Sequence, residues 1–350
     1  MRLKGLSWAV AVAATAALAA CGSSSSGTSS SASSAAPGAS ASGGGTVKEG
    51  LKVAVLPKAV NIAYFDAAFA GAKKACEEIK AAKCDQVGPT QATGPAQVQF
   101  INQVIQQRYD VLVVSAADAD SVVPALKKAG GANISVVTYD ADVSDTSARS
   151  AFVSTPAPKD IAEAQVKWIS EAIGPEGGEI AILSAAATAA NQNTWIKFMK
   201  EDLSANYPKL KLVDTVYGDD DAAKSAEKAA ALLQSHPNLK GIISPTTVGV
   251  REAAKYLSGS QYKGKVQVTG LGLPSEMKQY LKDGTVKTAG LWDPAQLGYV
   301  AVYAGATKAS GGNPATFTAG GKSFTADDKG IIIAAPPQDF TAANVDQFAF

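Results

Sequence analysis

Residues 51–56 read LKVAVL and residues 110–115 read DVLVVS, two short apolar runs rich in β-branched side chains. Between them, apolar residues such as Phe65, Phe69 and Ile79 recur at helical spacing. This alternation of apolar strands with amphipathic helices is typical of βαβ units in a parallel sheet. Because the runs are apolar almost throughout, we expect helices to cover both faces of the sheet.

The same pattern continues along the rest of the chain. Further strands are expected at Ile134–Asp140, Glu179–Ser184, Leu210–Gly218, Gly241–Pro245, Val266–Gly270 and Val286–Trp292. The stretch Arg149–Pro158 contains Ser, Thr and two Pro without helical periodicity, and it is interpreted as a crossover between two lobes. A length of 350 residues allows two domains. The predicted fold class is α/β, with two similar doubly wound parallel-sheet lobes joined by a multi-strand hinge.

Charge and composition argue against several classes of function. The 32 Lys and Arg are balanced by 31 Asp and Glu, so no basic surplus is present to neutralise phosphates, and nucleic acid is not expected as a partner. With Cys21 assigned to the lipobox described below, one His and two Cys leave too few ligands for a structural zinc site, which needs four, and no metal or cofactor is expected. His236 lies in a Pro–Asn turn, so we predict no catalytic residue. Paired carboxylates such as Asp118 and Asp120 keep a glycosidase as an alternative.

The N-terminus has the pattern of an export signal. Arg2 and Lys4 precede an apolar run that is shorter than the roughly 20 residues needed to span a membrane. The run Leu18-Ala19-Ala20-Cys21 resembles the bacterial lipobox. This resemblance implies that residues 1–20 are a lipoprotein signal peptide and that Cys21 is lipidated. Residues 21–50 are rich in Gly, Ser and Ala and are expected to form a disordered tether. We therefore expect an exported protein, lipid-anchored to the outer face of the cell membrane.

Cys76 and Cys84 are separated by eight positions. An oxidising compartment favours a disulfide between them. Their spacing in sequence does not fix the distance between their Cα atoms, so a buried Cys76 beside a free Cys84 is an equal alternative.

Polar and aromatic side chains follow the expected strands, at the edge where open parallel sheets bind ligands. Carboxylates and amides can bond to neighbouring hydroxyls, and aromatic faces can cover C–H groups, so these residues suit a polyhydroxylated ligand. Asx residues after strands are also favoured in caps and turns, which is the alternative role for each of them. The ligand-binding candidates are Lys58, Asn61, Tyr64, Phe65, Asp120, Asp140, Asn191, Gln192, Asn193, Asp219, Thr246, Thr247 and Trp292.

Several segments in register match one known family. They are Leu56–Lys58, Asn191–Trp195, Val216–Asp221, Gly241–Thr247, Asp283–Val286 and Leu291–Asp293. In these segments the chain from Leu51 to Phe350 resembles type I, ribose/rhamnose-type, periplasmic sugar-binding proteins of ABC importers. The resemblance implies a receptor that performs no catalysis, closes two lobes on a monosaccharide and delivers it to the transmembrane subunits of an ABC permease. It implies an N-terminal lobe of residues 51–154 and 293–319, a C-terminal lobe of 155–292 and 320–350, and a monomer.

Within that family the chain resembles the branch that holds rhamnose-binding and autoinducer-2-binding proteins. Autoinducer-2 binders are similar at Lys58, Asp120, Gln192 and Pro245, but they usually have Asp and Ala where Asn191 and Thr247 stand here. Rhamnose binders share the runs Asn191–Trp195 and Ser244–Thr247, but usually have Asn-Pro in place of Ile62-Ala63. The resemblance therefore favours L-rhamnose, with autoinducer-2, a polyol or another pentose or hexose as alternatives. A receptor linked to signalling would share the fold.

Overall fold

The computed structural model describes residues 47–350, which lie in one compact unit. The expected signal peptide at 1–20, the expected lipidation site Cys21 and most of the expected tether at 21–50 lie outside the described residues. Among residues 47–350, no helix has the length and apolar character needed to cross a membrane.

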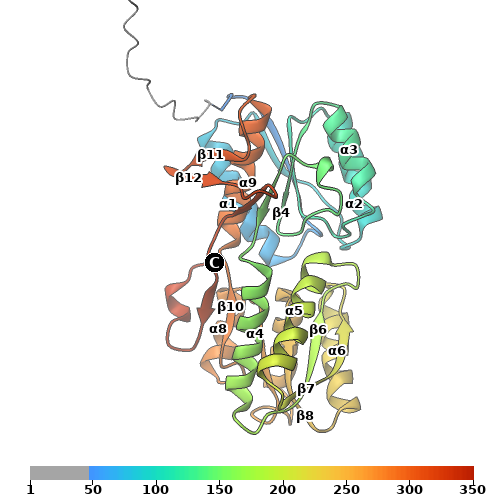
Figure 1. Cartoon of the computed structure of the whole chain (residues 1–350), viewed down its shortest axis with the longest axis vertical. Helices are drawn as coiled ribbons and strands as arrows, with labels where there is room; N and C mark the ends of the chain where they lie inside the picture. Colours follow the sequence, from blue (N-terminus) through green and yellow to red (C-terminus); the bar gives the residue numbers. More distant parts are fainter. Residues whose placement is uncertain (1–46) are drawn as a thin grey trace, which may run out of the picture. The chain divides into compact units, whose positions relative to one another are not determined.

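A six-stranded parallel sheet forms the first lobe, in the order β13-β5-β4-β3-β1-β2. Successive residues of a strand point to opposite faces. Val53 and Val55 pack in one core with α1 and α9, while Ala54 and Leu56 pack in the other with α2 and α3. Figure 1 shows these two helix pairs on either side of the sheet. The bounds are β1 (Lys52–Leu56), α1 (Ala63–Glu78), β2 (Lys83–Gln86), α2 (Gly94–Gln106), β3 (Val111–Val114), α3 (Val123–Gly131), β4 (Ser135–Tyr139), β5 (Ala151–Ser154), α9 (Pro294–Ala309) and β13 (Ile331–Ile333).

A four-stranded parallel sheet, in the order β7-β6-β8-β9, forms the second lobe. Beside it, β10 pairs antiparallel with β14. A separate hairpin of β11 and β12 packs against α9. The bounds are α4 (Pro158–Ile173), β6 (Gly178–Ser184), α5 (Ala190–Asn206), β7 (Leu210–Tyr217), α6 (Ala222–Ser235), β8 (Leu239–Ser244), α7 (Thr247–Ser258), β9 (Gln267–Gly270), α8 (Pro274–Lys282), β10 (Ala289–Leu291), β11 (Thr316–Ala319), β12 (Lys322–Thr325) and β14 (Gln338–Phe340), with short 3-10 helices at Thr146–Ala148 and Val345–Gln347.

All eight expected strands are present, but the stretch Arg149–Pro158 differs from its interpretation as a crossover. It contains β5, which pairs with β4 and β13, so only Thr155–Ala157 remains to connect β5 to α4. Four residues of apolar sequence are too short to give a clear strand signal when Ser and Pro flank them. We expected 320–350 in the C-terminal lobe, but β13 lies in the N-terminal sheet, because its three Ile extend the apolar edge beside β5.

Three connections join the two sheets. The chain leaves β5 for α4 through Thr155–Ala157, returns from β10 to α9 through Trp292 and Asp293, and leaves β13 for β14 through residues 334–337. This is the multi-strand hinge that the sequence predicts.

The structure joins Cys76 of α1 and Cys84 of β2 in a disulfide, with their Cα atoms 6.3 Å apart. Cys84 is therefore not free in this structure.

Candidate functional site

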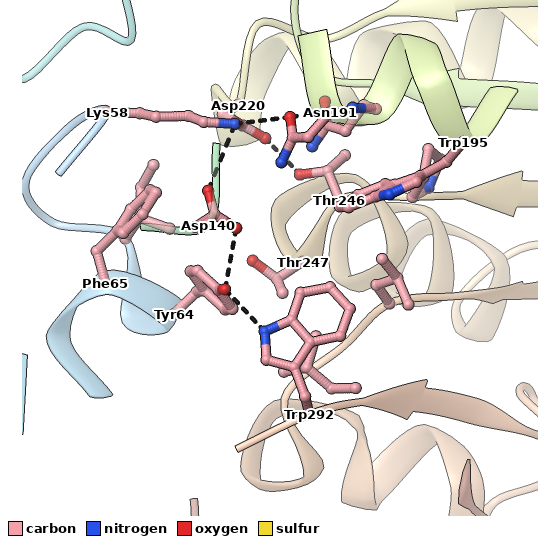
Figure 2. A pocket seen from close by; sticks show the side chains of 15 residues that line it. Lys58, Tyr64, Phe65, Asp140, Asn191, Trp195, Asp220, Thr246, Thr247 and Trp292 are labelled. Atoms are coloured by element: carbon pink, nitrogen blue, oxygen red, sulfur yellow. Dashed lines mark hydrogen bonds and ion pairs between the residues drawn. The ribbon is translucent and has the colours of Figure 1, made fainter. Parts of the chain in front are cut away.

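A cavity lies where the carboxyl ends of the two parallel sheets meet (Figure 2). Its empty volume is about 390 Å³, including its mouth. Nine of the thirteen ligand-binding candidates line it. The lining residues are Lys58, Ile62, Tyr64, Phe65, Asp140, Asn191, Gln192, Trp195, Asp220, Pro245, Thr246, Thr247, Leu271, Leu291 and Trp292.

The structure places the four other candidates elsewhere. Asn61 and Asp219 line the wider cleft that adjoins the cavity. Asp120 is exposed in the turn after β3, where its N–H donates to Asp118 Oδ1 at 3.0 Å. Asn193 Nδ2 donates to the carbonyl oxygen of Ala187 at 2.8 Å. The bond at Asp120 involves its backbone in a turn closed by the Asp118 carboxylate, and the Asn193 amide bonds locally near the start of α5.

Six lining residues were absent from the candidates. Trp195, one helical turn after Asn191, and Asp220, directly after Asp219, belong to the polar and aromatic residues that follow the expected strands, although neither was counted among the candidates. Ile62, Pro245, Leu271 and Leu291 offer no side-chain hydrogen-bonding group, and a search for polar strand ends does not find them.

Several residues around the site have left-handed backbone conformations. The φ angles are 66° at Asn61, 60° at Asp140, 54° at Asp219 and 51° at Asp220. Asn and Asp tolerate this region better than other residues with a side chain, because their short polar groups bond locally. At Asp140 the turn comes directly after β4, which ends the strand and leaves the carboxylate at the cavity.

A hydrogen-bonded network crosses the cleft at Lys58, which is only 3% exposed. Its Nζ donates to Asn191 Oδ1 of the second lobe at 3.1 Å and lies 3.6 Å from Asp140 Oδ2 of its own lobe. Asp140 also accepts from Ser115 Oγ at 2.8 Å and from Tyr64 OH at 3.0 Å. The Lys58 ammonium therefore has partners on both lobes.

The other end of this network reaches the hinge. Trp292 Nε1 donates to Tyr64 OH at 2.9 Å, and Tyr64 donates in turn to Asp140 (Figure 2). Burial, together with the neighbouring Asp140 carboxylate, raises the pKa of Tyr64 well above its ordinary value. Tyr64 therefore stays protonated at neutral pH and acts as a donor to Asp140.

Asp220 brings a second carboxylate to the cavity. It accepts a hydrogen bond from the Thr246 hydroxyl. Burial raises the pKa of Asp220, and the carboxylates of Asp140 and Asp219 add to that rise, while the Lys58 ammonium and Thr246 oppose it. One ammonium and two carboxylates thus line the cavity.

An aromatic and amide surface completes the cavity. The ring centroid of Trp292 lies 6.0 Å from that of Trp195 and 6.3 Å from that of Tyr64. Gln192 is 6% exposed, and its Oε1 has no hydrogen-bond partner among residues 47–350. Buried polar atoms are normally paired, so this oxygen can accept from a bound hydroxyl. Within the same residues, no group of three or more His, Cys, Asp or Glu is arranged to hold a metal ion.

The comparison with protein families agrees with this architecture. A model described as periplasmic binding protein domain matches residues 53–313. The chain belongs to the periplasmic binding protein family. As a family member it is a non-catalytic transport receptor of the periplasmic or extracellular side.

This periplasmic binding protein is similar to several solved structures. One is a sugar ABC transporter protein from Actinomyces odontolyticus, at 45% identity and a TM-score of 0.68, covering 86% of this chain and 98% of that one. Another is an ABC transporter solute-binding protein from Clostridium phytofermentas with bound L-rhamnose, at 34% identity, a TM-score of 0.81 and the same coverage. A third is LsrB from Clostridium saccharobutylicum in complex with AI-2, at 26% identity and a TM-score of 0.80, covering 86% and 100%.

A curated relative, the D-ribose/D-allose-binding protein of Pseudomonas aeruginosa, is 25% identical over 194 residues. That match covers 55% of this chain and 60% of the relative's length. The solved structures confirm the two-lobed α/β periplasmic binding protein fold that the sequence predicts.

Proposed function

We propose that this protein is the lipid-anchored sugar receptor of an ABC importer, which captures a monosaccharide in the cavity and delivers it to a membrane permease. The observation that carries the proposal is the cavity itself. It joins a charged hydrogen-bonding network from both lobes, centred on Lys58, to the aromatic side chains of Trp195 and Trp292. Such a cavity can bond to sugar hydroxyls and pack against the C–H groups of the ring.

Binding by this receptor requires no chemical step. Lys58 and Asp140 form charge-assisted hydrogen bonds with hydroxyls, which are stronger than bonds between neutral groups. The second lobe contributes Asn191, Gln192 and Thr247 to the same cavity. A ligand that bonds to both lobes favours the closed arrangement about the three hinge connections. Closure then removes water from the sugar and presents one defined form to the permease.

L-rhamnose is the best candidate ligand. The solute-binding protein that is 34% identical holds L-rhamnose, and the resemblance to rhamnose binders includes Asn191 and Thr247, which both line the cavity. Autoinducer-2 is the second candidate, favoured by the similarity to LsrB and by Lys58, Gln192 and Pro245 in the cavity. The departures from autoinducer-2 binders, at positions 191 and 247, lie at cavity-lining residues, and this supports L-rhamnose over autoinducer-2 in the proposal.

The test is a thermal-shift titration of residues 48–350 with L-rhamnose, other deoxy sugars, pentoses, hexoses, small polyols and autoinducer-2. A ligand at 1,000 times its dissociation constant stabilises the native protein by roughly 4 kcal/mol. That corresponds to a rise of several degrees in Tm. A shift with L-rhamnose alone supports the proposal. A shift with autoinducer-2 or a polyol, but not with L-rhamnose, would make that compound the proposed ligand instead. If no compound shifts the Tm, the proposal that the protein is a sugar receptor is contradicted.

A further inference from the structure

The cavity has two chemically different ends. Figure 2 shows Lys58, Asp220 and Asn191 together at one end and Trp292 at the opposite end, with Asp140 between them. The charged lining residues therefore lie toward the first end and the middle. A ligand that fills the cavity meets the charged groups on one side and the Trp292 indole on the other, with the Tyr64 hydroxyl bonded between Asp140 and Trp292.

Leu271 and Leu291 lie beside Trp292. Leu291 ends β10 and directly precedes Trp292, while Leu271 follows β9 and bridges Gly290 of β10. The Gly272 N–H also donates to the carbonyl oxygen of Gly290 at 3.0 Å, which fixes the two leucine segments side by side. Both leucines line the cavity and are 4% and 2% exposed. Their side chains present only carbon to a ligand.

An apolar surface of this kind favours a methyl group over a hydroxymethyl group. A hydroxyl buried against it loses its bonds to water and finds no donor or acceptor on the leucines. In the pyranose ring of a free 6-deoxyhexose, four consecutive carbons, C1 to C4, carry hydroxyls, and the C5 substituent is a methyl group. That division of polar and apolar groups matches the two ends of the cavity.

We infer that Leu271 and Leu291, together with Trp292, form the wall that receives the C6 methyl group of a 6-deoxyhexose. This wall selects 6-deoxy sugars over the corresponding hexoses, while the Lys58 end holds the ring hydroxyls. The inference rests on the proposed sugar-binding function and adds the residues that determine specificity.

The expected selectivity follows from the affinity that is lost when the C5 substituent of the sugar does not suit the apolar wall. An added hydroxyl in an apolar pocket weakens binding by about 100-fold at most, and a missing methylene by about 10-fold or more. L-mannose has the ring hydroxyls of L-rhamnose with a hydroxymethyl group at C5, and L-lyxose lacks C6. We expect L-rhamnose to bind about 10- to 100-fold more tightly than L-mannose, and about 10-fold more tightly than L-lyxose.

Isothermal titration calorimetry of residues 48–350 with these three sugars, and with L-fucose and L-galactose as a second matched pair, tests the inference. The variants are Leu271→Asn, which adds a polar group of similar size, and Leu291→Ala, which enlarges the apolar end. Leu273→Asn is the matched control, since Leu273 is buried but does not line the cavity. Circular dichroism melting confirms that each variant is folded. Leu271→Asn and Leu291→Ala should bring the affinity ratio of L-rhamnose to L-mannose close to one, whereas Leu273→Asn should preserve it.

Equal binding of L-rhamnose and L-mannose to the unmodified protein overturns the inference while leaving sugar binding intact. So does a preference that survives in both folded cavity variants. The parent protein could instead prefer L-fucose to L-galactose and lose this preference in the variants. That result supports the inference, with L-fucose taking the place of L-rhamnose as the proposed ligand. Failure of every sugar to bind overturns the proposed function and the inference with it.

Discussion

Lys58 is the residue on which the cross-cleft network depends, because its ammonium contacts a carboxylate on one lobe and an amide on the other. Lys58→Met keeps the length of the side chain and removes the charge. Hydrogen bonds to charged groups contribute about 1.5–3 kcal/mol. We therefore expect the ligand affinity to fall by about 10- to 100-fold, measured by titration calorimetry.

The matched control is Lys159→Met, which removes an exposed lysine paired with Glu163 at 3.5 Å. Such surface pairs contribute little, so the affinity should not change. Unchanged sugar affinity in Lys58→Met would contradict the role given to this network.

Asp220 makes the stability of the ligand-free protein depend on pH. Its pKa is raised in the folded state, chiefly by burial. At a pH between the ordinary pKa of 3.8 and the raised pKa, Asp220 therefore binds a proton more fully in the folded state than in the unfolded state. Stability therefore falls as the pH rises through that window. Asp220→Asn removes this contribution to the pH dependence. As the pH rises from about 4 to 7, the Tm of the variant should therefore rise relative to the Tm of the parent protein.

Asp328→Asn, at an exposed aspartate outside the cavity, is the control. Its Tm difference from the parent protein should not follow that trend. A pH-independent difference for Asp220→Asn would show that the carboxylate is not desolvated.

Sequence reasoning picked out most of the polar residues that line the cavity. Lys58, Asp140 and Asn191 follow strands and carry groups that a sugar can bond. Leu271 and Leu291 were not among the candidates, since a buried leucine at the end of a strand or just after it has the same local sequence whether it faces a core or a ligand. Only the tertiary arrangement separates those two roles.

At the scale of elements, α1 and α9 approach each other closely through glycine. A Cβ atom at Gly298 would lie 1.9 Å from the carbonyl oxygen of Ala68, and backbone cannot move aside cheaply. Gly298→Ala should therefore push the helices apart and destabilise the protein by about 1–3 kcal/mol in denaturant unfolding. Because Tyr64 lies at the start of α1 and Trp292 just before α9, sugar affinity should fall as well.

Gly130→Ala provides the contrast, because nothing lies within 4 Å of its added methyl group at the end of α3. Helix propensity alone should then make it neutral or stabilising by up to about 1 kcal/mol. Equal effects of the two substitutions would argue against tight α1–α9 packing.

The disulfide stabilises the opposite end of α1 from the cavity. Its loop is short, so replacing both Cys76 and Cys84 by Ala should cost about 2–3 kcal/mol of unfolding free energy. Sugar affinity should be unchanged, since Cys76 is about three turns away from Tyr64. Reductant should destabilise the parent protein by a similar amount and leave the double variant unaffected, as measured by denaturant unfolding.

The strands that sequence reasoning missed are the short ones. β5 and β13 have four and three residues, and each is stable only because it adds to an existing sheet edge. The eight expected strands have a local apolar pattern, even where, as in β3, β9 and β10, the strand is no longer than β5. The pairing of β13 with β5 joins segments far apart in the sequence, which no local pattern encodes.

For the whole molecule, sugar binding is expected to change the distance between the lobes. The cavity is lined by both lobes, so a bound sugar adds contacts that exist only when the cleft is closed. Small-angle scattering of residues 48–350 should show a smaller radius of gyration with saturating sugar. A galactitol sample at the same concentration controls for solvent contrast if calorimetry shows that it does not bind, and an identical radius with and without sugar would contradict closure.

The three connections between the sheets also set an order for assembly during synthesis and export. The second sheet is complete once β9 has been made, at residue 270, whereas the first sheet needs α9 on its face and β13 at its edge. An emerging chain can therefore not finish its first lobe until residue 333 is available. Until then the earliest-made third of the folded region, residues 47–154, lacks α9 on its face and β13 at its edge. Folding of the leading portion of the chain therefore awaits the arrival of its trailing portion.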